Sequence, residues 1–420
     1  MRDTQDTPLI CNAPAESATQ HGGAMNADPH LSVPPNNLTA REAVLRLRGS
    51  KIREVANASL GRSDVLAFWF GEPDEQTPQF IRRAGMASLE AGETFYTHNF
   101  GLIELRTALA NYISALHGPL AVENIIVTSS GMSALMLATQ ALVGAGDRVV
   151  EVTPLWPNLV EIPKVLGAEV ECVPLDFSAA GWTLDLDRLL SALKPGTRAL
   201  YVNAPNNPTG WTITREQQTA ILEHCRRLGI WIVADDAYDR IWFGEGDAAP
   251  AFLTLADKED RLVTTNTFSK SWLMTGWRMG WLVAPPELAI QIGKLIEYNT
   301  SCVPVFVQRA GLAAVESGEP VIRRTVERYR RARDFLVSKL NEIPRVQAAL
   351  PSGAMYAFFR VEGMTDSLAF CKSLVVEAQL GLAPGIAFGP EGEGFVRWCF
   401  ASSEERLADG VARLADALKR

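Results

Sequence analysis

The sequence is poor in the residues that build disulfide frameworks and metal centres. Its 420 residues include only 6 cysteines and 5 histidines. The cysteines lie far apart and form no Cys-x-x-Cys pair, so we expect free thiols in a cytoplasmic protein. No histidines have the spacing of a zinc-binding helix, so no metal site is expected. Any catalytic chemistry must therefore come from other side chains.

The chain also lacks an excess of positive charge and long runs of hydrophobic residues. The chain has 40 Lys and Arg against 48 Asp and Glu, a formal net charge of −8. This acidic balance argues against nucleic acid or an anionic membrane as the main partner. No run approaches the roughly 18 continuous apolar residues that a membrane span needs. We therefore expect a protein that acts on small molecules, with no nucleic-acid or membrane partner.

The overall composition is that of a globular protein, but the N-terminal segment differs from the rest. Apolar residues make up 47% of the chain and charged residues 21%, which is ample for a packed core. Residues 1–44 are rich in proline and poor in large apolar side chains. Such a segment cannot bury enough surface to offset its ordering entropy, so we predict a disordered N-terminal extension.

Beyond residue 125, short apolar runs alternate with helical patterns. One helix is predicted to begin after Thr214, which forms a capping-box pattern with Gln217, and to stop at Gly229. Strands that are apolar on both faces and alternate with helices indicate an α/β fold with a mostly parallel, helix-covered sheet. The predicted strands are 125–128, 148–152, 199–203, 230–234 and 262–268.

Unusual polar residues follow the ends of these predicted strands. Ligands of open α/β sheets bind beyond the carboxyl ends of the strands, where such residues would meet. They include a helix start, a flat aromatic, an amide, a carboxylate, a phenol and an amine: Ser130-Gly131, Trp156, Asn207, Asp235 with Tyr238, and Lys270.

Six motifs in this order give the sequence a resemblance to a known family. They are Gly71-Glu72-Pro73-Asp74, Tyr96-Thr97 with Gly101 and Leu105-Arg106, Asn206-Asn207-Pro208-Thr209-Gly210, Asp235-Asp236-Ala237-Tyr238, Ser269-Lys270 with Thr275-Gly276-Trp277-Arg278, and Pro351-Ser352-Gly353-Ala354. Together they resemble the class I/II aminotransferases, fold-type-I enzymes that use pyridoxal 5′-phosphate. The resemblance runs from about residue 45 to the C-terminus. It implies a large cofactor-binding domain (71–318), a smaller α+β domain (45–70 and 319–420), and a homodimer with active sites at the subunit interface.

The resemblance assigns the catalytic role to Lys270. Its amine would hold the cofactor's aldehyde as a Schiff base and then act as general base and acid at the substrate Cα. Asp235 would keep the cofactor's ring nitrogen protonated. Its neighbour Asp236 is expected to point the other way along the strand and to be structural.

The remaining cofactor contacts are also implied by the resemblance. Asn207 and Tyr238 would hydrogen-bond the phenolic oxygen, and Trp156 would stack on the ring. The phosphate would lie at a helix N-terminus, where backbone N–H groups favour an anion. Its expected ligands are Ser130, Gly131, Met132 through its backbone, Thr267, Ser269, Arg278, and Tyr96 from the other subunit.

The substrate contacts follow in the same way. Arg397 matches the family's reader of the α-carboxylate, for which a bidentate guanidinium is suited. The backbone of Gly71 would approach the same carboxylate, since glycine has no Cβ in the way. Asn207 and Trp156 would complete this site. In the family that the sequence resembles, members specific for dicarboxylates often use a second arginine of the partner subunit, from the region that corresponds to 301–307. Here that segment carries no cation, so we expect a preference for apolar or aromatic substrate side chains over aspartate.

The predicted function is transfer of an amino group between an L-amino acid and a 2-oxo acid. The alternative is a β-eliminating lyase on the same scaffold, which would share the cofactor-holding residues. A non-enzymatic sensor role is disfavoured because every catalytic position is intact. The arginine-rich stretch 323–333 is interleaved with acids and is expected to form a solvated helix face.

Overall fold

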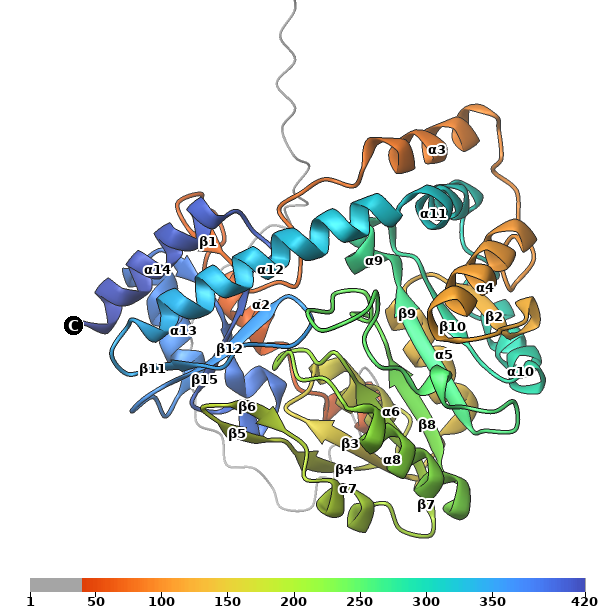
Figure 1. Ribbon diagram of the computed structural model, residues 1–420, viewed down its shortest axis with the longest axis horizontal. Coiled ribbons are helices and arrows are strands. Elements are labelled where there is room, and N and C mark those ends of the chain that lie inside the picture. The colour runs from red at the N-terminus through yellow and green to blue at the C-terminus, as the bar shows by residue number, and fades with distance from the viewer. Residues whose placement is uncertain (1–39, 420) are drawn as a thin grey trace, which may run out of the picture. The chain divides into compact units, whose positions relative to one another are not determined.

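The structure, a computed structural model of the chain, describes residues 40–419 (Figure 1). Most of the predicted N-terminal extension, residues 1–39, lies outside the described residues. The described chain begins with a short helix, α1 (Glu42–Leu45). The α/β fold class predicted from the sequence is confirmed.

A seven-stranded sheet forms the centre of the fold. Six of its strands run in one direction, and only β10 is antiparallel to its neighbours β2 and β9. In sheet order the strands are β2 (Ile125–Thr128), β10 (Gly280–Val283), β9 (Leu262–Thr267), β8 (Trp231–Asp235), β7 (Thr197–Asn203), β3 (Arg148–Thr153) and β4 (Glu169–Pro174).

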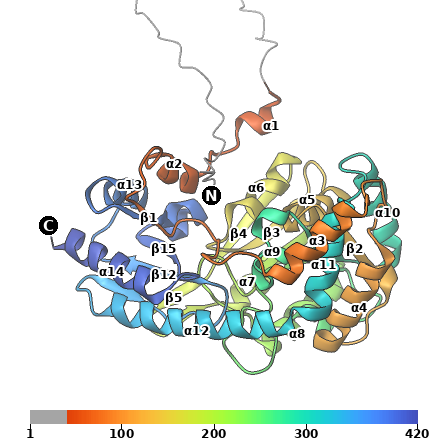
Figure 2. The same ribbon diagram turned by 90° about the horizontal axis from the view of Figure 1, so that it is seen from above.

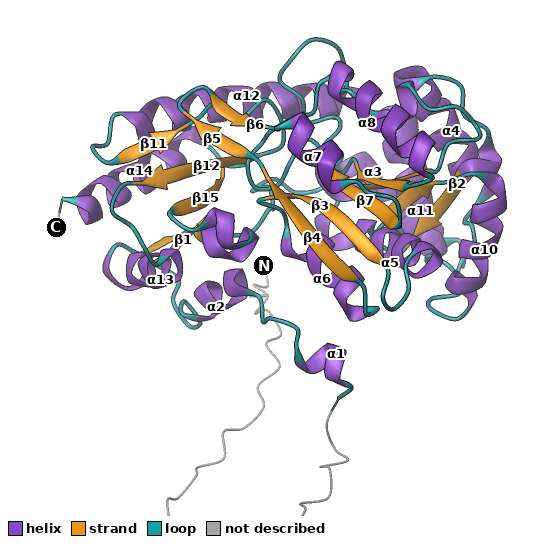
Figure 3. Ribbon diagram, turned by 90° about the horizontal axis from the view of Figure 1, so that it is seen from below, coloured by secondary structure: helices purple, strands orange, loops and turns teal. Residues whose placement is uncertain are grey.

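Helices cover both faces of this sheet (Figure 3). Because side chains alternate along a strand, neighbouring residues of β3 enter different cores: Val149 packs with α5, α6 and α10, and Val150 packs with α7 and α8. A third core, under α3, α4 and α11, covers β2 and β10. These helices are α3 (Gln79–Glu90), α4 (Ile103–His117), α5 (Gly131–Leu142), α6 (Pro157–Val165), α7 (Leu186–Ala192), α8 (Arg215–Leu228), α10 (Pro286–Glu297) and α11 (Val305–Ser317).

The local sequence signals explain where α8 begins and ends. Thr214 accepts a hydrogen bond from the backbone N–H of Gln217, and the Gln217 side chain accepts one in return from the Thr214 N–H. Gly229 ends the helix in the left-handed conformation, which glycine adopts at little cost. The predicted helix is therefore confirmed at both ends.

A second, antiparallel sheet is built from the C-terminal part of the chain (Figure 2). Its core includes Tyr329 of α12, Cys371 of α13 and Leu407 of α14, together with Val55 of α2. In sheet order the strands are β11 (Val346–Ala348), β12 (Tyr356–Val361), β15 (Phe395–Cys399) and β14 (Ala383–Pro384). The helices are α2 (Lys51–Asn57), α12 (Glu319–Asn341), α13 (Ser367–Glu377) and α14 (Glu404–Leu418).

Two short strand pairs complete the strands. β1 (Leu66–Ala67) pairs in parallel with β13 (Leu380–Gly381) beside the second sheet. β5 (Asp176–Ser178) and β6 (Gly181–Thr183) form a hairpin whose aromatic side chains pack on Phe395.

Candidate active site

A cavity of about 450 Å³ lies beyond the carboxyl ends of the large sheet's strands. Residues that follow β2, β3, β7, β8 and β9 line it, and the second sheet adds residues from β12 and β15. The sequence-predicted residues that it brings together are Gly71, Gly131, Met132, Trp156, Asn207, Asp235, Tyr238, Thr267, Ser269, Lys270, Arg278 and Arg397.

Lys270 lies on the short helix α9 (Phe268–Ser271), which follows β9 directly. The Thr267 hydroxyl caps this helix by accepting a 3.1 Å hydrogen bond from the Ser269 N–H. The Lys270 amine donates a 2.6 Å hydrogen bond to the carbonyl oxygen of Gly71. Burial, with a smaller contribution from the Arg397 charge, lowers the pKa of this amine to about 8. About a tenth of the amine is therefore neutral, and hence nucleophilic, at pH 7, far more than for an ordinary lysine.

Asp235 is the last residue of β8, and its side chain reaches the cavity floor. Its carboxylate accepts one long hydrogen bond, 3.3 Å, from the Ala237 N–H. Burial raises the pKa of this carboxyl group to about 7, because so little compensates its charge. Asp236, the next residue, does not line the cavity.

Arg397 projects from β15 and is only 2% exposed. Its Nη1 donates a 2.9 Å hydrogen bond to Asn207 Oδ1, and its Nη2 donates to the Trp69 carbonyl oxygen. The guanidinium lies 4.4 Å from the ring centre of Tyr356 and 4.8 Å from that of Phe388. Its Nε has no hydrogen-bond partner within residues 40–419. The group is thus fixed in orientation but keeps a buried donor to offer.

Tyr238 shares a 2.7 Å hydrogen bond with Tyr356, a residue that the sequence analysis did not identify. Tyr356 also explains why position 71 is a glycine: a Cβ on Gly71 would lie 1.9 Å from the Tyr356 hydroxyl. The one available signal was the position of Tyr356 just after the Pro-Ser-Gly-Ala motif, 351–354.

The N-terminus of α5 forms another part of the wall. Ser130 caps the helix through its hydroxyl, which accepts a 3.0 Å hydrogen bond from the Ser133 N–H. Its backbone has a φ of 141°, unusual for a residue other than glycine. Gly131 and Met132 line the cavity, whereas Ser130 itself does not. A Cβ at Gly280 would lie 2.5 Å from the Gly131 nitrogen. Strand β10 can therefore pack against the start of α5 only because its first residue is glycine.

Hydroxyl groups and a cation adjoin this helix start. The Thr267 hydroxyl donates a 2.9 Å hydrogen bond to the Ser269 hydroxyl. Arg278 lines the cavity, and its Nη1 donates a 2.7 Å hydrogen bond to the Thr275 carbonyl oxygen. A helix N-terminus, hydroxyls and a guanidinium together are suited to an anion such as a phosphate.

Tyr96, like Ser130, is a predicted residue that does not line the cavity. Its side chain is 87% exposed, on the loop between α3 and α4. The single chain therefore does not bring Tyr96 to the other predicted residues.

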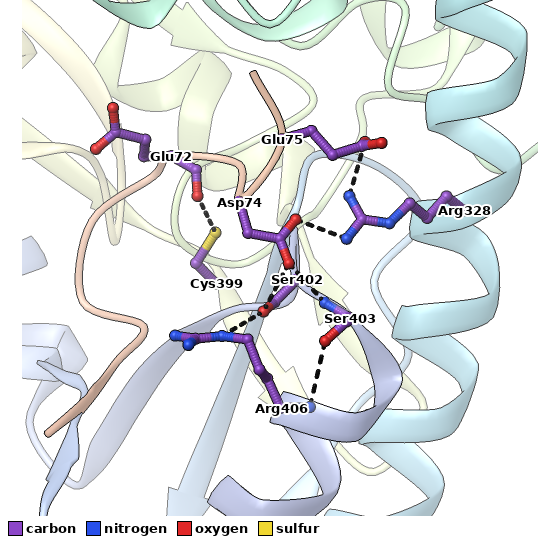
Figure 4. A network of polar contacts seen from close by, with 8 residues as sticks. All are labelled: Glu72, Asp74, Glu75, Arg328, Cys399, Ser402, Ser403 and Arg406. Carbon is purple, nitrogen blue, oxygen red and sulfur yellow. Dashed lines mark hydrogen bonds and ion pairs between the residues drawn. The ribbon is translucent and has the colours of Figure 1, made fainter. Parts of the chain in front are cut away.

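The loop that carries Gly71 is anchored to the second sheet's helices (Figure 4). Arg328 of α12 donates hydrogen bonds to Asp74 at 2.6 Å and to Glu75 at 2.7 Å. The other Asp74 oxygen accepts a 2.9 Å hydrogen bond from the Ser403 N–H at the start of α14. The expectation of a solvated arginine face is wrong for Arg328, which is 21% exposed in its side chain, and for the buried Arg333.

Helix α2 also contributes to the cavity, which no sequence motif indicated. Ser50, Ile52 and Arg53 line the cavity from this helix. No motif includes them, and a short helix so far ahead of the first strand of the large sheet gives no local sign of where it packs.

Two further observations concern what the described residues do not contain. Nowhere in residues 40–419 are three His, Cys, Asp or Glu side chains grouped so that they could hold a metal ion. Over the same residues, none of the helices is both long enough and apolar enough to cross a membrane.

The parallel-rich sheet and the lysine-containing cavity at its carboxyl edge define an α/β enzyme of the aminotransferase fold type. Comparison with known proteins then identifies the family: the model of aminotransferase class I and II matches residues 63–414. The chain therefore belongs to the class I and II aminotransferases, as its motifs predicted. It is a transaminase, and this family uses pyridoxal phosphate.

Relatives and solved structures agree with this assignment. An aspartate aminotransferase from Pyrococcus horikoshii is 33% identical over 90% of this chain and 97% of its own length. Aromatic-amino-acid aminotransferase 2 from Thermococcus litoralis is 29% identical over 88% of this chain and 96% of its own. The crystal structure of the aspartate aminotransferase from Thermotoga maritima has a TM-score of 0.84 at 31% identity, and covers 91% of this chain and 100% of that one.

Proposed function

We propose that this chain binds pyridoxal 5′-phosphate in the cavity and uses it to move an amino group between an L-amino acid and a 2-oxo acid. One observation carries this proposal: the Lys270 amine, with its pKa lowered to about 8, shares a cavity with the Asp235 carboxyl group and the Arg397 guanidinium. Lysine is the side chain whose amine can condense with an aldehyde, and these two groups complement it.

The residues present fit the cofactor. Asp235 is a buried carboxyl group with one long hydrogen bond, so a protonated ring nitrogen would supply the partner that it lacks. The α5 start at Gly131, the hydroxyls of Thr267 and Ser269, and Arg278 would hold the phosphate. When bound, pyridoxal phosphate takes up the electron pair left when the Cα–H bond of the substrate breaks.

The chain's own residues would divide the remaining work. Lys270, once free of the cofactor, would accept the proton from the substrate Cα on its Nζ and would donate it to the C4′ carbon of the cofactor. Asn207 and Tyr238 would orient the ring through hydrogen bonds, and Trp156 would support its face. Arg397 would bind the α-carboxylate, for which its unpartnered buried Nε is available.

We also propose that the chain divides into a large domain (71–318) and a small domain (45–70 and 319–420). The seven strands of the large sheet fall within the first range, and the four strands of the second sheet fall within the last. Since the cavity is lined from both ranges, closure of the small domain would exclude water from the reacting atoms.

The test replaces Lys270 by alanine. We expect Lys270→Ala to abolish amino transfer from every donor in a panel of amino acids and to remove the visible absorbance of lysine-bound cofactor, with the fold retained by circular dichroism. Lys194→Ala, an exposed lysine outside the cavity, is the matched control and should match the wild-type protein. Amino transfer that survives Lys270→Ala would refute the assignment. Release of pyruvate and ammonia without a 2-oxo acid acceptor would instead indicate the β-eliminating lyase.

We propose that the active unit is a homodimer in which Tyr96 enters the partner's cavity. Phe95, Tyr96 and Tyr298 are 83%, 87% and 90% exposed, an unusual group of aromatics to leave in water. Their two segments are joined, because the Thr97 N–H lies 3.5 Å from the sulfur of Cys302. A second copy of the chain would cover this surface.

Subunit mixing tests the dimer. Lys270→Ala and Tyr96→Ala proteins should each be impaired, and refolding them together should restore about a quarter of the wild-type sites, because each mixed dimer regains one intact site. No recovery on mixing, or a monomer by analytical ultracentrifugation, would contradict this arrangement.

We include a cytoplasmic location in the proposal. The described cysteines are free thiols, and three of them, Cys225, Cys371 and Cys399, are buried in the core. Such thiols are typical of a reducing compartment. Fractionation of cells that express the tagged chain would test it, and recovery outside the cytoplasm would contradict it.

A further inference from the structure

An arginine that no catalytic role uses lies in the wall of the cavity. Arg53 is in the first turn of α2, where its backbone N–H donates to the capping hydroxyl of Ser50 at 3.3 Å. Its side chain is exposed, and within residues 40–419 its guanidinium has no ion pair and no hydrogen bond. It is thus a cation with no partner at the ligand-binding cavity.

The rest of α2 is anchored, so Arg53 is held in place. Ile52 and Val55 are buried in the core of the second sheet. Glu54, the nearest acid on the helix, accepts hydrogen bonds from Lys51 at 2.9 Å and from Lys372 of α13 at 2.6 Å. These two amines lower the pKa of Glu54 to about 2, so its charge is already neutralised.

The charges around the cavity are unequal. Four cationic side chains line it against one carboxyl group: Arg53, Lys270, Arg278 and Arg397 against Asp235. Under the proposed function, on which this inference rests, Lys270 reacts, Arg278 faces the phosphate, Arg397 faces the α-carboxylate and Asp235 faces the ring. Only Arg53 remains without an anion. A guanidinium without an anionic partner in a cavity wall favours binding of a ligand that carries a carboxylate.

The position of Arg53 suits the substrate's side chain. The helix α2 packs against β14, and in β14 Ala383 pairs with Arg397 of β15. Both arginines line the cavity, and Arg397 is buried whereas Arg53 is exposed, so Arg397 belongs to its interior and Arg53 to its solvent-facing wall. An amino acid held through its α-carboxylate by Arg397 can extend its side chain toward Arg53.

We propose that Arg53 binds the side-chain carboxylate of the substrate, so that this transaminase acts on dicarboxylic amino acids and 2-oxo acids. The cation that was missing from segment 301–307 is supplied from α2 instead. This replaces the expectation of an apolar or aromatic side chain.

The kinetic test compares acidic donors with their neutral amides in the holoenzyme. In Arg53→Gln we expect kcat/KM for aspartate and glutamate to fall about 10- to 100-fold, mainly through KM, since one charge-assisted contact is lost from both ground and transition state. Asparagine and glutamine should change by less than about twofold, and Arg53→Lys should recover part of the loss. Arg215→Gln, an exposed arginine of α8 outside the cavity, is the matched control and should leave both classes unchanged.

A binding measurement reads Arg53 without any reaction. Succinate should bind the wild-type holoenzyme more tightly than butyrate by calorimetry, and Arg53→Gln should remove most of this difference. Wild-type preference for neutral donors, equal losses for acidic and neutral donors in Arg53→Gln, or unchanged succinate binding would each overturn the proposal. If the wild-type protein transfers no amino group at all, the proposed function fails, and succinate binding still decides whether Arg53 holds a carboxylate.

Discussion

Glu151 gives the sharpest prediction, because it is a fully buried acid that the site does not use. It lies on β3 between Cys172 of β4 and Tyr201 of β7. Both of its carboxyl oxygens are buried without a hydrogen-bond partner within residues 40–419. Burial raises the pKa of Glu151 to about 8, so the carboxyl group is protonated in the folded chain at neutral pH.

The cost to stability follows from proton linkage. The unfolded chain releases the Glu151 proton above pH 4.5 and the folded chain keeps it, so stability falls as the pH rises from 4.5 toward 8. With these two pKa values, Glu151 costs about 3 kcal/mol of unfolding free energy at pH 7 and less than about 1 kcal/mol at pH 5. Glu151→Gln keeps the shape and polarity of the protonated acid but cannot ionise in the unfolded chain.

The variant should therefore gain stability only as the pH rises. Urea unfolding of Glu151→Gln should give a free energy within about 1 kcal/mol of the wild type at about pH 5 and a gain of about 3–5 kcal/mol at about pH 8. Glu169→Gln, an exposed acid on the adjacent strand β4, should change stability by less than about 0.5 kcal/mol at both values. A gain that is equal at both pH values, or a loss at pH 8, would refute the reasoning.

Two further predictions concern the site. Arg328→Gln should cost about 1–2 kcal/mol of unfolding free energy and raise KM, because it frees Asp74 and Glu75 and loosens the Gly71 loop. Denaturation measures the first effect and steady-state kinetics the second, and an unchanged KM would count against the loop's role. Asp235→Asn should lower kcat at least about 100-fold while cofactor absorbance is retained, because an amide cannot hold a proton on the ring nitrogen. Single-turnover kinetics would measure the loss, and a loss of under tenfold would oppose that role for Asp235.

The strands that the sequence predicted are those whose signal is local. Residues 125–128, 199–203 and 230–234 are apolar runs, and the structure has β2, β7 and β8 at these positions within a residue or two. The strand β10, Gly280–Val283, was missed although Trp281-Leu282-Val283 is an apolar run, because a run this short does not distinguish a strand from a segment of buried helix. It is formed by pairing between β2 and β9, which are far apart in the sequence.

The same distinction separates the parts of the site. Lys270 and Asp235 could be identified because each lies near the carboxyl end of a predicted strand and belongs to a motif. Tyr356 and Arg53 could not, because each reaches the cavity only through packing of the second sheet and α2. Arg328 was misread for a related reason: the acids that neutralise it, Asp74 and Glu75, are not its neighbours on the helix.

The Gly71 loop joins these nonlocal parts to the reacting amine. Its carbonyl oxygen holds the Lys270 amine at 2.6 Å, and Asp74 in the same loop is held by α12 and α14. A hydrogen bond to a charged group contributes about 1.5–3 kcal/mol net, so it satisfies the buried amine until a ligand offers another partner. Because the anchor of the loop is on the second sheet's helices, movement of that sheet would move the carbonyl that holds Lys270. Substrate binding and the availability of the amine would then be coupled through this one loop.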